Sequence, residues 1–123
     1  MATLTLQQQI TGVINGVTET WTNSYRVNIS DARKGSFLAG TTYRDIRDVT
    51  IEASPLVVFL ANRGTNGAVY RIKSGSNYFR FDLPAGTATV VHLAKLRFYG
   101  SQAPDGIAVY SASGTTIETM VCY

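Results

Sequence analysis

The feature that most constrains this chain is a short, continuous apolar run near its middle, followed by a turn and an alternating segment. Residues 56–60 are five consecutive apolar residues, too short a run for a buried helix and typical of a strand covered on both faces. Residues 63–67 supply an asparagine and two glycines, which reach the positive φ values of tight connections. In residues 68–73, Tyr70 and Ile72 share one face. The stretch predicts a central β-hairpin with one side in water.

The N-terminal part of the chain carries a second hairpin signal. Apolar residues fall mainly on even positions before Asn15 and Gly16 and on odd positions after them. An Asn-Gly pair between two alternating runs is the strongest short hairpin signal. Positions 10, 13, 14, 17 and 21 also match helical spacing, but the glycines at 12 and 16 and the many threonines weaken a helix. We therefore predict two strands.

Further short strands are expected along the rest of the chain. Residues 30–40 are expected to form a connection that contains a short strand at 36–39. Residues 41–53 are expected to form an edge strand or a long exposed connection, and their charged side chains would block edge-to-edge pairing with another chain. Later strands are expected at 78–83, 87–93, 95–99, 107–111 and 115–123. Turns recurring at this interval predict an all-β, antiparallel β-sandwich, jelly-roll-like, of about eight or nine strands. We expect one domain over residues 1–123, with 1–9 as a candidate extended N-terminal arm.

Charge and cysteine content narrow the class of protein. The net charge is +3, and residues 54–123 hold six basic against three acidic residues. This mild bias suits an acidic partner or nucleic acid but falls short of a dedicated nucleic-acid binder. Cys122 is the only cysteine, which excludes an internal disulfide and fits a reducing cytoplasm. No signal peptide or membrane-spanning apolar segment is recognised, so we expect a soluble protein made in the cytoplasm.

Catalytic patterns are missing from the sequence. His92 is the only histidine, lies between Val91 and Leu93 in an alternating segment, and is expected on an exposed or interfacial face. No Gly-x-Ser-x-Gly elbow is present. The glycines at 64 and 67 lack the Lys-Ser/Thr pair of a phosphate loop, and Cys122 is expected to pack as a small hydrophobe. We therefore expect no enzyme activity, no cofactor and no metal site built on cysteines.

One group of carboxylates was considered as a site. Asp45, Asp48 and Glu52 are close in sequence, but Arg44 and Arg47 lie between them. Interleaved charges of this kind favour a surface network of ion pairs over a glycosidase pair or a calcium site.

Aromatic residues and arginines alternate at 78–81 and 97–99, a pattern that suits stacking and phosphate contacts with single-stranded nucleic acid. The same alternation places Phe79, Phe81 and Phe98 in the core and leaves tyrosines and arginines outside. A core role for the phenylalanines explains the pattern better than nucleic-acid binding does. Nucleic acid is therefore not the expected partner. A carbohydrate- or nucleic-acid-binding module would use exposed aromatic residues, although Trp21 also fits a core position. These residues are Trp21, Tyr25, Tyr43, Tyr70 and Tyr99.

The order of these elements resembles the small virion structural proteins of tailed bacteriophages. The matching features are the apolar run at 56–62, the turn Pro84-Ala85-Gly86 before an apolar strand, the closing strand at 117–123 (IETMVCY), and the threonine-rich opening at 3–22. The resemblance spans most of the chain and consists of turn and pattern signals without an invariant chemical group. It implies a β-sandwich that coats or joins parts of a particle, with no catalytic residues to transfer.

The resemblance leads us to expect a capsid decoration protein, located in the virion after synthesis in the host cytoplasm. It would sit on the shell as a homo-oligomer and contact the major capsid protein through loops and the N-terminal segment. The alternatives are a neck, tail or fibre-attachment subunit, or a carbohydrate- or nucleic-acid-binding β module. The candidate interface residues are Leu4, Leu6, Arg33, Lys34, Tyr43, Arg44 and Arg47.

Overall fold

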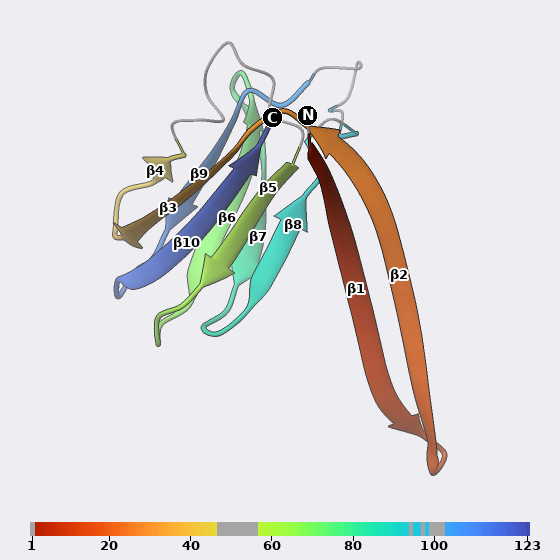
Figure 1. Cartoon of the computed structure of the whole chain (residues 1–123). Helices are drawn as coiled ribbons and strands as arrows, with labels where there is room; N and C mark the ends of the chain where they lie inside the picture. The colour runs from red at the N-terminus through yellow and green to blue at the C-terminus, as the bar shows by residue number, and fades with distance from the viewer. Residues whose placement is uncertain (1, 47–56, 94, 97, 99–102) are drawn as a thin grey trace. The chain divides into compact units, whose positions relative to one another are not determined.

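The chain is built from antiparallel β-strands (Figure 1). The computed structural model describes residues 2–46, 57–93, 95–96, 98 and 103–123, and the predicted all-β fold class is confirmed over them. Among these residues no helix is long and apolar enough to span a membrane. The chain divides into two compact units, Met1–Asp31 and Ala32–Tyr123, where one sandwich over the whole chain was expected.

The first unit is a single long hairpin. Strands β1 (Ala2–Ile14) and β2 (Val17–Ile29) pair along their whole length, from Ala2 opposite Ile29 to Ile14 opposite Val17. Asn15 and Gly16 both have positive φ, 52° and 79°, as a two-residue type I′ turn requires. The predicted hairpin is confirmed and the helical alternative is wrong. The candidate arm at residues 2–9 forms part of the paired strand β1.

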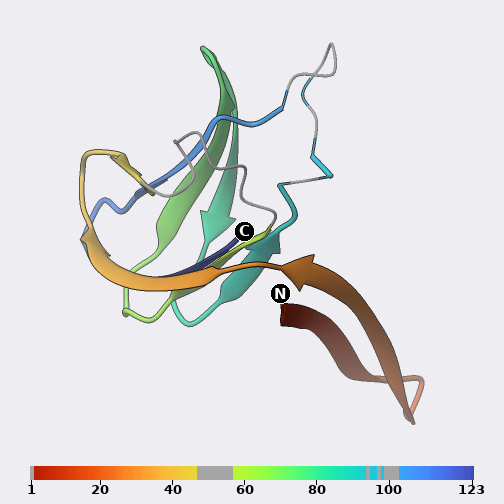
Figure 2. The same ribbon diagram turned by 45° about the horizontal axis from the view of Figure 1, so that its top comes forward.

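The second unit consists of two four-stranded sheets (Figures 1 and 2). The first sheet has the order β3 (Ala32–Ala39), β10 (Thr115–Cys122), β5 (Val57–Asn62) and β8 (Ala88–Val91). The second has the order β4 (Arg44–Asp45), β9 (Gly106–Tyr110), β6 (Ala68–Ser74) and β7 (Asn77–Leu83). The pairs β3–β10, β4–β9, β5–β8 and β6–β7 are nested in the sequence. A two-stranded ribbon rolled up on itself gives this order, which is that of a jelly roll.

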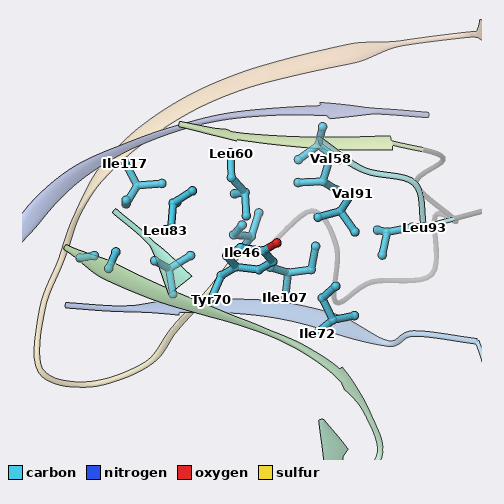
Figure 3. Close-up of a cluster of buried hydrophobic side chains, with 14 of the residues drawn as sticks. Ile46, Val58, Leu60, Tyr70, Ile72, Leu83, Val91, Leu93, Ile107 and Ile117 are labelled. Atoms are coloured by element: carbon cyan, nitrogen blue, oxygen red, sulfur yellow. The ribbon is translucent and has the colours of Figure 1, made fainter. Parts of the chain in front are cut away.

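The core lies between the two sheets. Figure 3 shows Val58, Leu60 and Ile117 of the first sheet pointing toward Tyr70 and Ile107 of the second. Strand β5 is buried along nearly its whole length, as the continuous apolar run predicted. In β6 the alternation is also confirmed, because its even-numbered residues are buried and its odd-numbered residues are partly exposed.

The predicted central hairpin is wrong in its pairing. Strand β5 pairs with β10 and β8, whereas β6 pairs with β7 and β9, so the turn at 63–67 carries the chain from one sheet to the other. Turn residues mark a reversal of the chain and do not determine which strand becomes the hydrogen-bonded neighbour.

Two other predicted strands differ from the structure. The short strand expected at 36–39 extends back to Ala32. The strand expected at 95–99 is wrong at Lys95 and Leu96, because their amides bond to the carbonyls of His92 and Leu93 in a turn, whereas Phe98 forms a β-bridge. Arg97 and Tyr99 lie outside the described residues.

A wholly buried asparagine at the end of β5 holds the loops together. The Asn62 side-chain amide donates to the carbonyls of Asn66 at 2.8 Å and Leu83 at 2.9 Å. Its oxygen accepts from the Gly64 amide at 3.1 Å and from Thr115 Oγ1 at 2.7 Å. Both donors and both acceptor positions of one side chain are therefore used. They join the 63–67 turn to the end of β7 and the start of β10.

Candidate interaction surfaces

The β1–β2 hairpin has one apolar and one polar face. The register places even-numbered residues of β1 beside odd-numbered residues of β2. The other face is rich in Thr, Gln, Ser and Asn, with hydroxyls such as Thr11 and Thr20 paired across the strands at 3.3 Å. On the apolar face Ile10 is 66% exposed and Trp21, its cross-strand neighbour, is 47% exposed. The described apolar side chains of this face are Ala2, Leu4, Leu6, Ile10, Ile14, Val17, Trp21, Val27 and Ile29.

Burial on this apolar face changes along the hairpin. Ile29 at the base is buried, and the predicted interface residues Leu4 and Leu6 are half-buried. The large side chains of the tip half are exposed, including Ile14 and Val17 beside the turn. An isolated two-stranded ribbon is only marginally stable in water, and contiguous exposed apolar side chains mark interaction surfaces. The tip half of the hairpin is therefore a candidate contact surface for another protein.

A second apolar surface lies on the open side of the sandwich. Strands β7 and β8 are the end strands of the two sheets, and a hollow of about 310 Å³ lies between them. We call it the β7–β8 groove. Its apolar lining is Tyr70, Ile72, Phe81, Val90, Val91 and Leu96, and its polar lining is His92 and Lys95.

Two phenylalanines beside the groove differ from the predicted core. Phe79 and Phe81 share a face with the buried Leu83, as predicted, but are 53% and 44% exposed. Phe81 stacks on Tyr70 with ring centroids 5.2 Å apart, and Phe79 stacks on buried Phe98 at 5.0 Å. Strand β7 carries both residues and is an end strand of its sheet. Its inward-facing side chains therefore have a neighbouring strand on one side only. Tyr70, expected among the exposed aromatic residues, is buried instead.

The outer face of the second sheet carries a stacked arginine that sequence reasoning missed. The Arg71 guanidinium lies 4.0 Å from the ring centroid of Tyr43 and 5.5 Å from that of Tyr78. Tyr43, a predicted interface residue, also packs on Tyr110 at 5.3 Å. The available signal was the outward position of Arg71 in the alternating strand β6, but Tyr43, the nearer of its two ring partners, comes from a segment distant in sequence.

Two predicted interface arginines lie over aromatic rings. Arg33 lies 5.5 Å from the Tyr123 ring centroid and Arg44 lies 4.8 Å from that of Phe37. Both arginines are exposed, and the two rings that they contact pack against the core. Arg47 lies outside the described residues.

Within the described residues, strand β3 is the other end strand of the first sheet. Lys34 is exposed on it, and Leu38 is 68% exposed four residues later. Of the predicted interface residues, Leu4 and Leu6 lie on the hairpin, and Arg33 and Lys34 lie on β3. Arg44 packs on Phe37 of β3, and Tyr43 packs on Tyr110 and Arg71.

A shallow hollow of about 330 Å³ lies beside the loops at one end of the sandwich. Its lining includes Val69, Tyr110 and Ser111 together with the carboxylate of Asp82. The Ser111 hydroxyl is bonded to the Gly67 carbonyl at 2.8 Å. A hollow lined by a tyrosine and an aspartate suits a polyhydroxylated ligand, which offers both a C–H face and hydroxyl donors.

Among the candidates for chemistry, the structure describes His92, Asp45 and Cys122. His92 is half-buried between buried Val91 and Leu93. Asp45 pairs with Lys73 at 3.3 Å, while Asp48 and Glu52 lie outside the described residues. Within the described part of the chain no group of three potential metal ligands occurs.

Cys122 is wholly buried, and burial raises the pKa of its thiol. At a pH between the ordinary thiol pKa and the raised one, the thiol of Cys122 stays protonated in the folded chain and loses its proton in the unfolded chain. The contribution of Cys122 to the free energy of unfolding is therefore constant at neutral pH and falls as the pH rises above the ordinary pKa, by up to about 1.4 kcal/mol per pH unit. We expect urea unfolding from neutral pH to about pH 10 to show a shallower decline for Cys122→Ala. Parallel declines for the two proteins would contradict this linkage.

Comparisons with protein-family models, with curated protein sequences and with solved structures find no match for this chain. Its function is therefore inferred from the jelly-roll strand order and from the exposed surfaces described above.

Proposed function

We propose that this chain is a structural protein of a virion, and specifically a decoration protein bound to a shell of major capsid protein. The observation that carries the proposal is the long hairpin with an exposed apolar face. Such a face requires a protein surface to cover it. A subunit that works by assembly provides that surface in its functional state.

The jelly-roll strand order is compatible with a role in a virion, but it does not distinguish this role from others. Double-sheet jelly rolls occur in viral capsid proteins, in lectins and in cupins, and a fold alone does not determine function. The hairpin favours the assembly role, because binding a small soluble ligand needs only a hollow in the sandwich.

Strand β3 suits the contact with the shell. It is an end strand of its sheet among the described residues, and adding a strand beside an end strand is a common mode of peptide recognition. The exposed side chains of Lys34 and Leu38 provide a charge and an apolar anchor on that strand. On a particle each contact is repeated many times, so weak individual contacts are sufficient for stable coating.

Reversing one charge on β3 tests the shell contact. Lys34→Glu is expected to reduce binding to shells stripped of this protein about tenfold, because it places a repelling charge at a contact edge. Quantitative co-sedimentation at two salt concentrations measures the change. Arg80→Glu, an exposed position on the end strand β7, is the matched control and should bind as wild type. Equal binding by both variants would contradict a contact through β3.

A carbohydrate-binding role is a second candidate, and the hollow containing Tyr110 and Asp82 favours it. Titration with soluble glycans, followed by the NMR signals of residues around this hollow, tests that role. Saturable shifts confined to the hollow would support it, whereas unchanged spectra at millimolar glycan would remove it.

A further inference from the structure

We propose that the tip half of the β1–β2 hairpin packs its apolar face into the β7–β8 groove of a second copy of this chain. The contact needs no shell and no other protein, so it goes beyond the proposed decoration role. In this contact the exposed hairpin face of one copy and the exposed groove of another cover each other.

The length of the hairpin favours a second copy over the chain's own sandwich. Strands of 13 residues extend about 43 Å at the usual rise of ~3.3 Å per residue. The longest sandwich strands have eight residues and extend about 26 Å by the same rise. Only Ser30 and Asp31 separate β2 from β3. A hairpin longer than the sandwich cannot be covered along its whole length by a single sandwich, so its exposed side chains need a further neighbour.

The two surfaces match in chemical character. The hairpin face offers Ile10, Ile14, Val17 and Trp21, and the groove offers aliphatic and aromatic side chains with Phe79 at its margin. Burying such side chains against each other contributes about 25 cal/mol per Å² of apolar surface. This contribution explains why both surfaces are apolar in a soluble chain.

The charges of the two surfaces are complementary. Glu19 is the only charged residue of the hairpin face, since Arg26 lies on the opposite face. The groove contributes exposed Lys95 and half-buried His92, and no carboxylate is among its lining residues. Two hairpin faces packed on each other would bring acidic residues together, whereas the groove presents a cation. Charge therefore favours the hairpin-to-groove contact over a hairpin-to-hairpin contact.

The size of the purified protein gives the first test. Light scattering after size-exclusion chromatography is expected to show a dimer or a closed ring. Ile10→Asp should weaken the association at least 100-fold, because it buries an unpaired carboxylate in an apolar contact. Thr11→Asp adds the same charge one residue away on the opposite face and should associate as wild type. A monomeric wild-type protein, or equal loss in both variants, would overturn the proposal.

Disulfide trapping identifies the contact itself and does not depend on how Ile10→Asp folds. Val17→Cys in one preparation and Phe79→Cys in another, both carrying Cys122→Ala, are mixed and oxidised. A mixed disulfide joining the two chains is expected. Thr18→Cys, on the opposite face beside Val17, is the control and should cross-link poorly with Phe79→Cys.

The other products of the trapping experiment would overturn the inference. Disulfides joining only two Val17→Cys chains would show hairpin-to-hairpin packing. Dilution-independent cross-linking within a single chain that carries both Val17→Cys and Phe79→Cys would show that each hairpin covers its own groove. Either result leaves the decoration role to be judged separately, because no shell takes part in this experiment.

Discussion

Asn62→Ala is expected to lower the free energy of unfolding by about 3 kcal/mol or more, a large part of the stability of a domain of this size. The substitution leaves the Gly64 amide and the carbonyls of Asn66 and Leu83 without the partner they have in the fold. Each buried polar group left unsatisfied costs about 1–3 kcal/mol, and the lost side chain leaves a cavity as well. Urea unfolding followed by far-ultraviolet circular dichroism measures the loss.

Asn66→Ala is the matched control for this prediction. Its side chain bonds to the carbonyls of Ser113 and Gly114 in a partly exposed loop, where water can replace the amide. A cost of about 1 kcal/mol is expected. If Asn62→Ala costs no more than Asn66→Ala, the buried amide does not hold the loops together as described.

Gly64→Ala is expected to destabilise the sandwich by about 3 kcal/mol through overpacking. A Cβ on residue 64 would lie far inside van der Waals contact with Oγ1 of Thr115 and 3.0 Å from the backbone amide of Thr116. Thr115 is itself buried and bonded to Asn62, so it cannot move without breaking that bond. The midpoint of urea unfolding measures the effect.

Gly67→Ala, in the same turn, is the control, because a Cβ there meets nothing within 4 Å. It should change the free energy of unfolding by less than about 0.5 kcal/mol. Gly64→Ala and Asn62→Ala should be non-additive, since both disturb Thr115. Equal stability of the two glycine variants would contradict the close approach of β10 to this turn.

Local sequence signals predicted which segments form strands better than they predicted which strands pair with each other. The Asn15-Gly16 pair identified the hairpin because its turn chemistry requires positive φ at both residues. The alternation around Tyr70 and Ile72 identified the buried face of β6. Pairing in the jelly roll joins segments distant in sequence, such as β3 with β10. No turn signal encodes that pairing, and the predicted β5–β6 hairpin was wrong for this reason.

The interaction surfaces were predictable only in part. Leu4 and Leu6 were placed on the hairpin by their spacing, and the hairpin face containing them is exposed in its tip half. The exposure of Phe79 and Phe81 was not predictable, because periodicity gives the face of a strand and not its position at the end of a sheet. The stacking of Arg71 on two tyrosines depends on strands β6 and β7 meeting the segment that precedes β4.

The central claim is that this chain is a structural component of a capsid shell. Quantitative mass spectrometry of purified particles, separated into heads and tails, tests it most directly by giving the copy number relative to the major capsid protein. The account predicts a copy number comparable with that of the major capsid protein, confined to the head fraction. A few copies, or enrichment with tails, would contradict decoration and assign the protein to the neck or tail. Its absence from both fractions would contradict the virion role.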